Sequence, residues 1–417
     1  MKSFIMKSLS VTVLVKIFGL VRDVLTFYFI GVSAEFDSYI FFLTIPAIFS
    51  SVLIPFINLW CVPLLRKSNN SERETYFLFF VLVSFFSAFI LFFISLLPAC
   101  LNGSFDAFAI ALILTSLLVF VFSVLAEYSA SLLIIDGKVD KIYYGNLLVN
   151  IPVVIYLVFS DVTVLMLAIV SSFSFVLRFL YLNHYTLGKR AIFSFQNLSS
   201  LGRVVDNLKK LDLHNVKKLF FGPSFQISIY LGRLFCSFLP EGSVSMYFYG
   251  FKLFDAFKGT VLFVVITKFF SMIQNLSLKQ SINLMFKCIN ILVYISLGYL
   301  LFLFCLWGVG TYIDVTNYLE FDLSKVNDIF YFSMFTFFLF LQYPVMVLYQ
   351  RLIVSFDNVE LYFDSILYML ASQVTLLSLF YLLGILNVEM VISILSIGML
   401  FPFVTILMRL RPKKISI

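Results

Sequence analysis

The sequence predicts an all-α, polytopic membrane protein with about twelve transmembrane helices, from its composition and its apolar runs. Hydrophobic residues make up 62% of the 417 positions and charged residues only 12%. A soluble domain averages about 45–50% apolar and about 25% charged residues, so this chain lacks the charges that would cover a soluble core. Runs of about 20 apolar residues, the length that crosses a bilayer, recur along the whole chain. A soluble enzyme, a disordered protein and a secreted disulfide scaffold are therefore excluded.

The first half of the chain contains the runs that we assign to an N-terminal six-helix lobe, residues 1–183. They cover residues 10–32, 37–64, 75–98, 107–134, 142–160 and 162–183. The first ten residues continue into the first run without a small-residue cleavage site. We therefore predict a retained first helix rather than a signal peptide.

A polar, basic stretch over residues 184–217 is predicted to be a cytoplasmic linker to a second six-helix lobe, residues 218–417, which ends in a short basic tail. The apolar runs of this lobe cover residues 218–239, 243–270, 284–307, 327–353, 361–384 and 388–408. Acidic turns at Glu35 and Glu241 follow the first predicted helix of each half, and this similarity is a weak internal repeat. Two six-helix lobes around a central cavity are a common transporter plan.

The distribution of Lys and Arg predicts that both termini lie in the cytoplasm. One set of alternate loops carries nearly all the basic residues, whereas the other set contains Lys325 as its one basic residue and several acids. Cytoplasmic loops of membrane proteins are enriched in Lys and Arg. The formal net charge of +7 thus indicates orientation and contact with anionic lipid headgroups. Nucleic-acid binding is not indicated, because the basic residues are scattered over many short loops.

The sequence shows no pattern for covalent chemistry, a metal or a cofactor. Its five cysteines have neither paired nor metal spacing, and both histidines, His184 and His214, fall in one loop. No nucleophile elbow, P-loop, zinc-protease motif or dinucleotide fingerprint is present. We expect a transporter rather than an enzyme, without metal or cofactor. Active transport would draw on a gradient or on downstream consumption, and the choice between H⁺ and Na⁺ as coupling ion stays open.

Cations inside the predicted helices are the main functional signal. They are Lys16, Arg22, Arg178, Arg233 and Lys252. Each would cost about 2.5–3.5 kcal/mol at a helix centre in the bilayer. One structural explanation is snorkelling, in which a long stem carries the charge to the interface. We favour it for Arg178, near the predicted end of its helix, and find it least suitable for Arg22, near the middle of the first run.

Pairing with a nearby acid is a second structural explanation. Lys16 and Asp23 are seven residues apart and share a helix face. Lys252 and Asp255 are three residues apart and also share one. Such pairs would lower the insertion cost without requiring any function.

The functional explanation is a site for an anion such as a pyrophosphate, which suits forked guanidinium and compact ammonium groups. Arg22 and Lys252 lie in the first and eighth predicted helices, one in each lobe, and this predicts a central site between the lobes. Lys16 and Arg233 are further candidates. The supporting acids, which would orient the cations or couple to an ion, are Asp23, Asp37 and Asp255.

Other interior residues allow two explanations each. Glu127 and Asp364 are carboxylates that we expect to be buried, where they would either bind a coupling ion or form hydrogen bonds with neighbouring groups. Gly19 and the Gly222-Pro223 pair interrupt predicted helices and are candidate gating positions. Gly and Pro are, however, frequent in membrane helices in any case.

Two stretches of the sequence also carry a family resemblance. The first is Lys16-Ile17-Phe18-Gly19-Leu20-Val21-Arg22-Asp23, followed by Asp37. The second contains Gly222-Pro223, Gly242-Ser243-Val244-Ser245, Tyr247, Lys252-Leu253 and Asp255. In order and spacing they resemble the lipid II flippase family (MurJ or MviN type).

This resemblance implies a fold, a substrate class and a location. The fold would be that of the multidrug/oligosaccharidyl-lipid/polysaccharide (MOP) superfamily, with alternating access between two lobes. The substrate would be an undecaprenyl-pyrophosphate-linked saccharide, and the location the bacterial inner membrane. The resemblance places the family's functional cations on Lys16, Arg22 and Lys252, and its second-helix acid on Asp37.

Departures from the family pattern affect the expected substrate. Lys replaces the family's Arg at positions 16 and 252, and Ser50 and Ser51 stand where the family has basic residues. The sequence also ends after the twelfth predicted helix, whereas lipid II flippases commonly have two more. These departures favour a related O-antigen or capsule repeat-unit flippase (Wzx type) over a lipid II flippase. The expected partners are the lipid-linked saccharide, membrane lipids and polysaccharide assembly proteins.

Two other functions fit a protein of this length and apolarity. A polysaccharide polymerase (Wzy type) would catalyse glycosyl transfer and usually carries a large periplasmic loop, whereas the longest polar loop here is predicted to be cytoplasmic. A cation or drug antiporter of the MATE type would favour an acidic cavity, whereas the interior charges of this chain are mostly basic.

Overall fold

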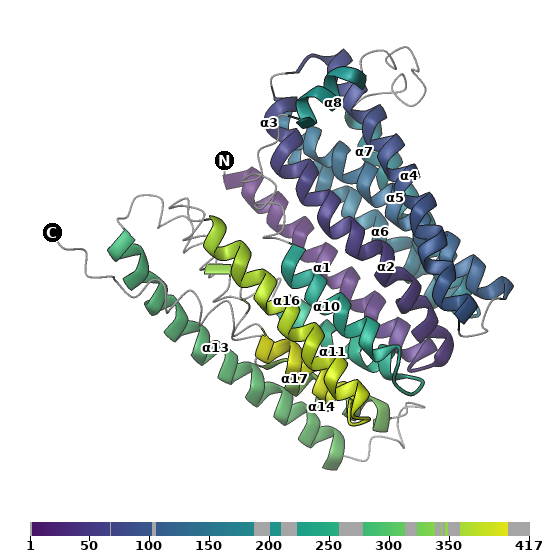
Figure 1. The fold of residues 1–417 in the computed structure, drawn as a ribbon, viewed down its shortest axis with the longest axis vertical. Coiled ribbons are helices and arrows are strands. Elements are labelled where there is room, and N and C mark those ends of the chain that lie inside the picture. Colours follow the sequence, from purple (N-terminus) through teal and green to yellow (C-terminus); the bar gives the residue numbers. More distant parts are fainter. Residues whose placement is uncertain are drawn as a thin grey trace. The chain divides into compact units, whose positions relative to one another are not determined.

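The computed structural model of the chain describes residues 2–66, 68–101, 106–186, 201–209, 223–257, 278–312, 323–337, 343, 347–348 and 359–398. The elements in these ranges are helices, and they include helix in each predicted apolar run. The all-α prediction is therefore confirmed. The chain divides into two compact units, Met1–Asp212 and Leu213–Ile417, whose helices are labelled in Figure 1. The lobe boundaries at residues 183 and 218 and the central cavity stay predictions.

The first unit is built around α5. Its elements are α1 (Lys2–Ile30), α2 (Ala34–Phe56), the π-helical segment η1 (Ile57–Cys61), α3 (Val62–Leu65), α4 (Asn70–Leu101), α5 (Ala107–Ile135), α6 (Val139–Phe159), α7 (Val164–Thr186) and α8 (Leu201–Lys209). Buried residues occur on every side of α5, as expected for a helix surrounded by others. It packs against α2, α4 and α7, while α6 packs against α7 and α1.

The helix α4 has one face for the protein core and another that is exposed. Phe80 and Leu91 are fully buried, whereas Phe86, Phe89 and Phe93 are 67%, 62% and 55% exposed. The two sets follow the helical period on opposite faces. In a membrane protein, the exposed aromatic face is the surface that lipid covers.

Short polar residues and one glycine fix where helices of the first unit begin and end. Asn69 and Glu72 form a capping box at the start of α4, with each side chain accepting from the other's backbone N–H. Asp106 accepts from the Ala109 N–H at 2.8 Å and caps α5. Gly31 follows α1 with a φ of +62°, a left-handed conformation that ends helices and favours glycine.

The second unit packs several helices around α10. Its helices are α10 (Pro223–Cys236), α11 (Ser243–Phe257), α13 (Leu278–Tyr312), α14 (Leu323–Phe335), α16 (Val359–Leu382) and α17 (Val388–Gly398). α10 contacts α11, α16 and α17, and α14 contacts α11, α13 and α17. Gly232 on α10 permits a close approach of its neighbours, because a Cβ there would meet the Tyr247 hydroxyl and lie 2.6 Å from Leu395 Cδ1.

Seven helices in the described ranges are long and apolar enough to cross a membrane. They lie in Ala34–Phe56, Asn70–Leu97, Ala107–Ile135, Val139–Phe159, Val164–Thr186, Asn283–Gly308 and Phe363–Leu382. The chain is thus a multi-pass membrane protein. The cytoplasmic location of its termini stays a prediction.

Candidate functional site

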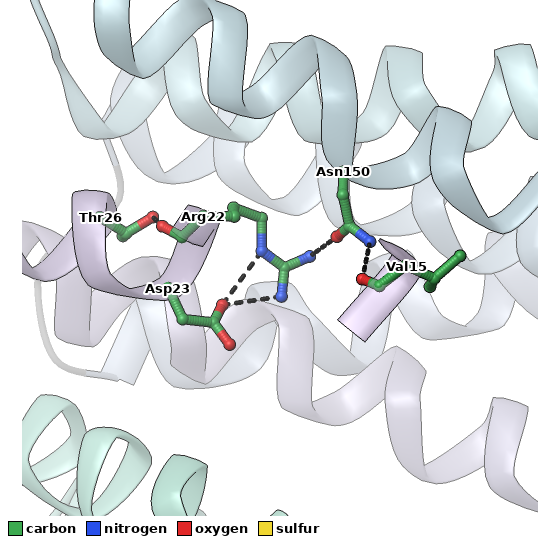
Figure 2. Close-up of polar contacts among 5 residues, drawn as sticks. All are labelled: Val15, Arg22, Asp23, Thr26 and Asn150. Atoms are coloured by element: carbon green, nitrogen blue, oxygen red, sulfur yellow. Dashed lines mark hydrogen bonds and ion pairs between the residues drawn. The ribbon is translucent and has the colours of Figure 1, made fainter. Parts of the chain in front are cut away.

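Arg22 on α1 is held by two polar partners. Its Nε and Nη2 donate to Asp23 Oδ1 at 3.0 and 2.7 Å, and its Nη1 donates to Asn150 Oδ1 on α6 at 2.9 Å. Figure 2 shows the guanidinium between these two side chains. The side chains of Arg22 and Asp23 are 27% and 20% exposed. Asp23 therefore places a negative charge directly beside this partly buried cation.

Asn150 was missed by the sequence analysis, although it is the residue that joins Arg22 to another helix. It is 7% exposed and lies 128 positions from Arg22 in the chain. Its Nδ2 donates to the Val15 carbonyl at 3.5 Å, as drawn in Figure 2. The available signal was a lone amide inside the apolar run 142–160, because polar side chains are rare in membrane helices unless they have partners.

The predicted pairing of Lys16 with Asp23 stays a prediction. Asp23 binds the guanidinium of Arg22, the preceding residue, and Lys16 is exposed on α1. The guanidinium offers two donors, Nε and Nη2, to one oxygen of this carboxylate. Asp37, the predicted second-helix acid, lies in the first turn of α2, where a negative charge is favoured by the helix dipole.

Arg233 and Lys252, the candidate cations of the second unit, lie against the same aromatic ring. Arg233 Cζ is 5.1 Å from the centroid of Phe248, and Lys252 Nζ is 4.5 Å from it. Arg233 also lies 5.2 Å from the ring centroid of Tyr230. Cation–π contacts of this kind hold a positive charge without neutralising it. The unit thus carries two neighbouring cations, one from α10 and one from α11.

Arg178 corrects one expectation. Snorkelling was favoured for it, yet its residue exposure is only 8%, and its Nη2 lies 2.5 Å from Glu127 Oε1 on α5. Snorkelling is wrong here because a carboxylate on the neighbouring helix satisfies the charge inside the bundle. The same contact supports the hydrogen-bonded explanation for Glu127. Asp364 is half-buried on α16, and its role as a coupling carboxylate stays a prediction.

The gating candidates fall on different kinds of structure. α1 runs unbroken through Gly19, where an added Cβ would lie 3.9 Å from Asn150 Nδ2. Pro223 is the first residue of α10, a position that suits proline because the missing N–H would have no helical partner. Gly222 lies outside the described residues. Gating by these positions stays a prediction, as does an orienting role for Asp255, which is half-buried on α11.

A buried amide also joins the helices of the second unit, and it too was missed. Ser228 Oγ on α10 donates to Gln373 Oε1 on α16 at 3.0 Å, and Gln373 Nε2 donates to the Leu395 carbonyl on α17 at 2.9 Å. Gln373 is fully buried. Its amide uses both ends, as a buried polar group must. Within the described ranges, no three His, Cys, Asp or Glu side chains are grouped to hold a metal ion.

Comparisons with known proteins identify the fold. No protein-family description matches the sequence, and no curated protein matches it. Among solved structures, "Lipid II flippase MurJ, inward closed conformation" is similar with a TM-score of 0.76 and 17% identity, over 98% of this chain and 88% of that one. An inward-facing multidrug resistance MATE family transporter of the MOP superfamily is similar with a TM-score of 0.58 and 12% identity, over 94% and 93%.

A further similar structure is that of a MOP superfamily transporter from Pyrococcus furiosus, which is described as having a binding pocket of reverse polarity. Its TM-score is 0.50 at 14% identity, over 97% of this chain and 92% of that one. At these identities the similarity concerns the fold. The chain therefore has the fold of the MOP-superfamily transporters, with a resemblance to the lipid II flippase MurJ.

Proposed function

We propose that the chain is a bacterial inner-membrane flippase for an undecaprenyl-pyrophosphate-linked saccharide. The observation that carries this proposal is the half-buried Arg22, whose guanidinium is fixed by Asp23 and Asn150 within a MurJ-like fold. A fixed guanidinium with remaining N–H groups suits a phosphate, which accepts two parallel hydrogen bonds. Lys252 and Arg233, which share contacts with the ring of Phe248, are further basic residues of the chain that suit an anionic substrate.

The transport step involves no covalent chemistry. The pyrophosphate enters from the cytoplasmic side and binds the cations, while the prenyl chain stays in lipid. The lobes then expose the saccharide to the periplasm by alternating access. An inside-negative potential favours outward movement of the anion by about 2.3 kcal/mol per charge at 100 mV. Coupling to H⁺ or Na⁺ at an interior carboxylate such as Asp364, and contacts with polysaccharide assembly proteins, also belong to this proposal.

The substrate we favour is an O-antigen or capsule repeat unit, with lipid II as the alternative. The Lys residues at positions 16 and 252, and the serines at 50 and 51, weaken the match to the lipid II flippases. A multidrug resistance MATE family transporter is similar in fold, and a cation or drug antiporter is the alternative function. The basic character of Arg22, Arg233 and Lys252 favours an anionic substrate instead, because like charges repel a cation in a low-dielectric site.

The test is complementation in two bacterial strains, one depleted of its lipid II flippase and one lacking an O-antigen flippase. Each strain receives the wild type, Arg22→Ala, Arg22→Lys or the control Lys138→Ala, which removes an exposed cation from the α5–α6 turn. We expect the wild type and the control to restore surface polysaccharide in the second strain. Arg22→Ala should abolish rescue, and Arg22→Lys should reduce it because the forked donor is lost.

Other results would redirect the proposal. Restored viability of the first strain would identify lipid II as a substrate. Full rescue by Arg22→Ala would contradict an anion site at this position. To exclude effects on expression, the amount of each variant in the membrane fraction is measured by immunoblot.

A further inference from the structure

Asn150 connects α6 to α1 through both ends of its amide. Its Oδ1 accepts from Arg22 Nη1 at 2.9 Å, and its Nδ2 donates to the Val15 carbonyl at 3.5 Å. Figure 2 shows the amide directed at α1 with these two contacts. An asparagine offers an acceptor at one end and donors at the other. This side chain thus has the chemistry that the facing surface of α1 requires.

The surface of α1 is shaped for this amide. Val15, Gly19 and Arg22 are spaced by four and three residues, so they lie along one helix face. Gly19 lies between the two hydrogen-bonding positions, and an added Cβ there would be in ordinary van der Waals contact with Asn150 Nδ2, at 3.9 Å, so Asn150 faces this part of α1. The arginine side chain leans toward the N-terminus of its helix, which brings the guanidinium back toward Gly19. The position of the guanidinium therefore depends on Asn150 as well as on Asp23.

The hydrogen bonds to Arg22 leave donors for a ligand. A guanidinium has five N–H groups, and three take part in the bonds to Asp23 and Asn150. Within the described residues, one N–H on each of Nη1 and Nη2 has no recorded acceptor. These two terminal nitrogens are the pair that can bind two oxygens of one phosphate.

The charge of the partners is as important as their geometry. Asp23 already brings one negative charge to Arg22 at 2.7 Å. Asn150 adds a strong acceptor without adding charge, so the attraction of the site for an anion is preserved. A second carboxylate at this position would keep an acceptor for Arg22, but it would lose the donor to the Val15 carbonyl and make the group of side chains net negative.

We propose that Asn150 is a positioning residue that aims the Arg22 guanidinium at a phosphoryl group and, by being neutral, keeps the site attractive to anions. The proposal rests on the proposed function and deepens it. It predicts an unusual order of affinities, in which wild type binds best, Asn150→Leu next and Asn150→Asp worst. A purely structural role predicts the reverse order for the two variants, because Asp retains the contact with Arg22 and Leu does not.

The experiment measures binding of undecaprenyl pyrophosphate to the full-length protein in nanodiscs of phosphatidylethanolamine and phosphatidylglycerol. We expect Asn150→Leu to bind roughly tenfold more weakly and Asn150→Asp roughly a hundredfold more weakly. Asn183→Leu is the matched control, since Asn183 is another buried asparagine of the same unit, 2% exposed on α7, and should bind as the wild type does. The midpoint of thermal unfolding of each variant is measured in parallel and should fall less for Asn150→Asp than for Asn150→Leu.

An Arg22→Ala background shows whether Asn150 acts through Arg22. There, Asn150→Leu should weaken binding less than twofold further, since the group that it positions is gone. If the Asn150→Leu variant does not insert into the membrane, Asn150→Ser gives the same information, because the serine side chain is too short to reach Arg22. Affinity of Asn150→Asp equal to that of the wild type, or additive losses in the double variant, would overturn the proposal.

Failure of the proposed function gives a different result. If wild type does not bind the lipid, or if Arg22→Ala binds it equally well, the anion site itself is wrong and the role of Asn150 is overturned with it. If Arg22→Ala weakens binding while the Asn150 variants do not, the anion site stands and the positioning role alone is overturned.

Discussion

The Arg178 guanidinium and the Glu127 carboxylate form an ion pair of 2.5 Å between α7 and α5. Arg178 is 8% exposed, and its Nε has no hydrogen-bond partner in the described part of the chain. The burial of this cation therefore depends on Glu127. Removal of one member of a buried pair typically costs about 3–5 kcal/mol, because the other charge is left uncompensated.

We expect Glu127→Leu and Arg178→Met each to lower the midpoint of thermal unfolding in detergent by roughly 5–15 °C. The double variant Glu127→Leu/Arg178→Met should recover most of the loss, since an apolar pair leaves no buried charge. The measurement is a fluorescence-monitored melting curve of each purified variant. Additive losses in the double variant would show that the two side chains contribute independently and not as a pair.

Gly232 should tolerate no larger residue. A Cβ at this position would meet the Tyr247 hydroxyl, which donates to the Ile229 carbonyl at 3.0 Å, and the side chain of Leu395. We expect Gly232→Ala to destabilise the protein by about 1–3 kcal/mol through overpacking, measured as a lower midpoint of thermal unfolding. Addition of Tyr247→Phe should recover part of this loss, because the nearest contacting atom is then removed.

Gly298→Ala is the matched control for this substitution. Gly298 lies inside α13, and among the described residues no heavy atom beyond its own helix backbone and chain neighbours would lie within 4 Å of an added Cβ. Alanine favours a helix more than glycine does, by about 0.5–1 kcal/mol, so this variant should melt at the wild-type temperature or slightly above it. Equal destabilisation by both substitutions would mean that lost glycine flexibility, and not close packing at α10, explains the effect.

The sequence predicted the helices well because a membrane imposes a length and a polarity on each of them. The run 107–134 corresponds to α5, Ala107–Ile135, and the run 162–183 to α7, Val164–Thr186. The boundaries differ where apolarity and helix formation are separate properties. α1 begins at Lys2 rather than at residue 10, since polar Lys and Ser residues continue a helix beyond the part that lipid surrounds.

The partners of the charged residues were much less predictable. Periodicity identifies residues that share a face of one helix, and it suggested Lys16 for Asp23. Which helices are neighbours is not encoded in that period, so Asn150 and Glu127 were not assigned to Arg22 and Arg178, from which they lie 128 and 51 positions away. The free-energy cost of placing a charge in the bilayer did identify the cations that need partners. It did not identify the side chains that act as those partners.

Phe248 should contribute to transport through the two cations that it contacts. Its ring lies 5.1 Å from Arg233 Cζ and 4.5 Å from Lys252 Nζ. A cation–π contact contributes about 0.5–2 kcal/mol, so we expect Phe248→Leu to reduce flippase activity in proteoliposomes by roughly 2- to 30-fold. Phe248→Tyr, which retains the ring, should keep most of the activity.

The control for Phe248 is Phe286→Leu, which removes a 46% exposed aromatic ring from α13. This variant should transport as the wild type does, because its ring has no cation contact recorded among the described residues. If Phe248→Leu also transports normally, the aromatic contact is not needed to hold Arg233 and Lys252 in their working positions.

The predicted orientation can be tested at the two ends of one helix. Lys138 and Ser160 flank α6 and are both exposed, so a cysteine at either position is accessible to a reagent in water. In a variant without native cysteines, we expect a membrane-impermeant maleimide added to intact cells to label Ser160→Cys. It should label Lys138→Cys only after the inner membrane is permeabilised, because the basic α5–α6 turn is predicted to be cytoplasmic.

The opposite pattern would invert the topology and place both termini in the periplasm. Labelling of both cysteines in intact cells would contradict a membrane crossing by α6, since its 21 residues would then have both ends on one side of a bilayer that they are long enough to span.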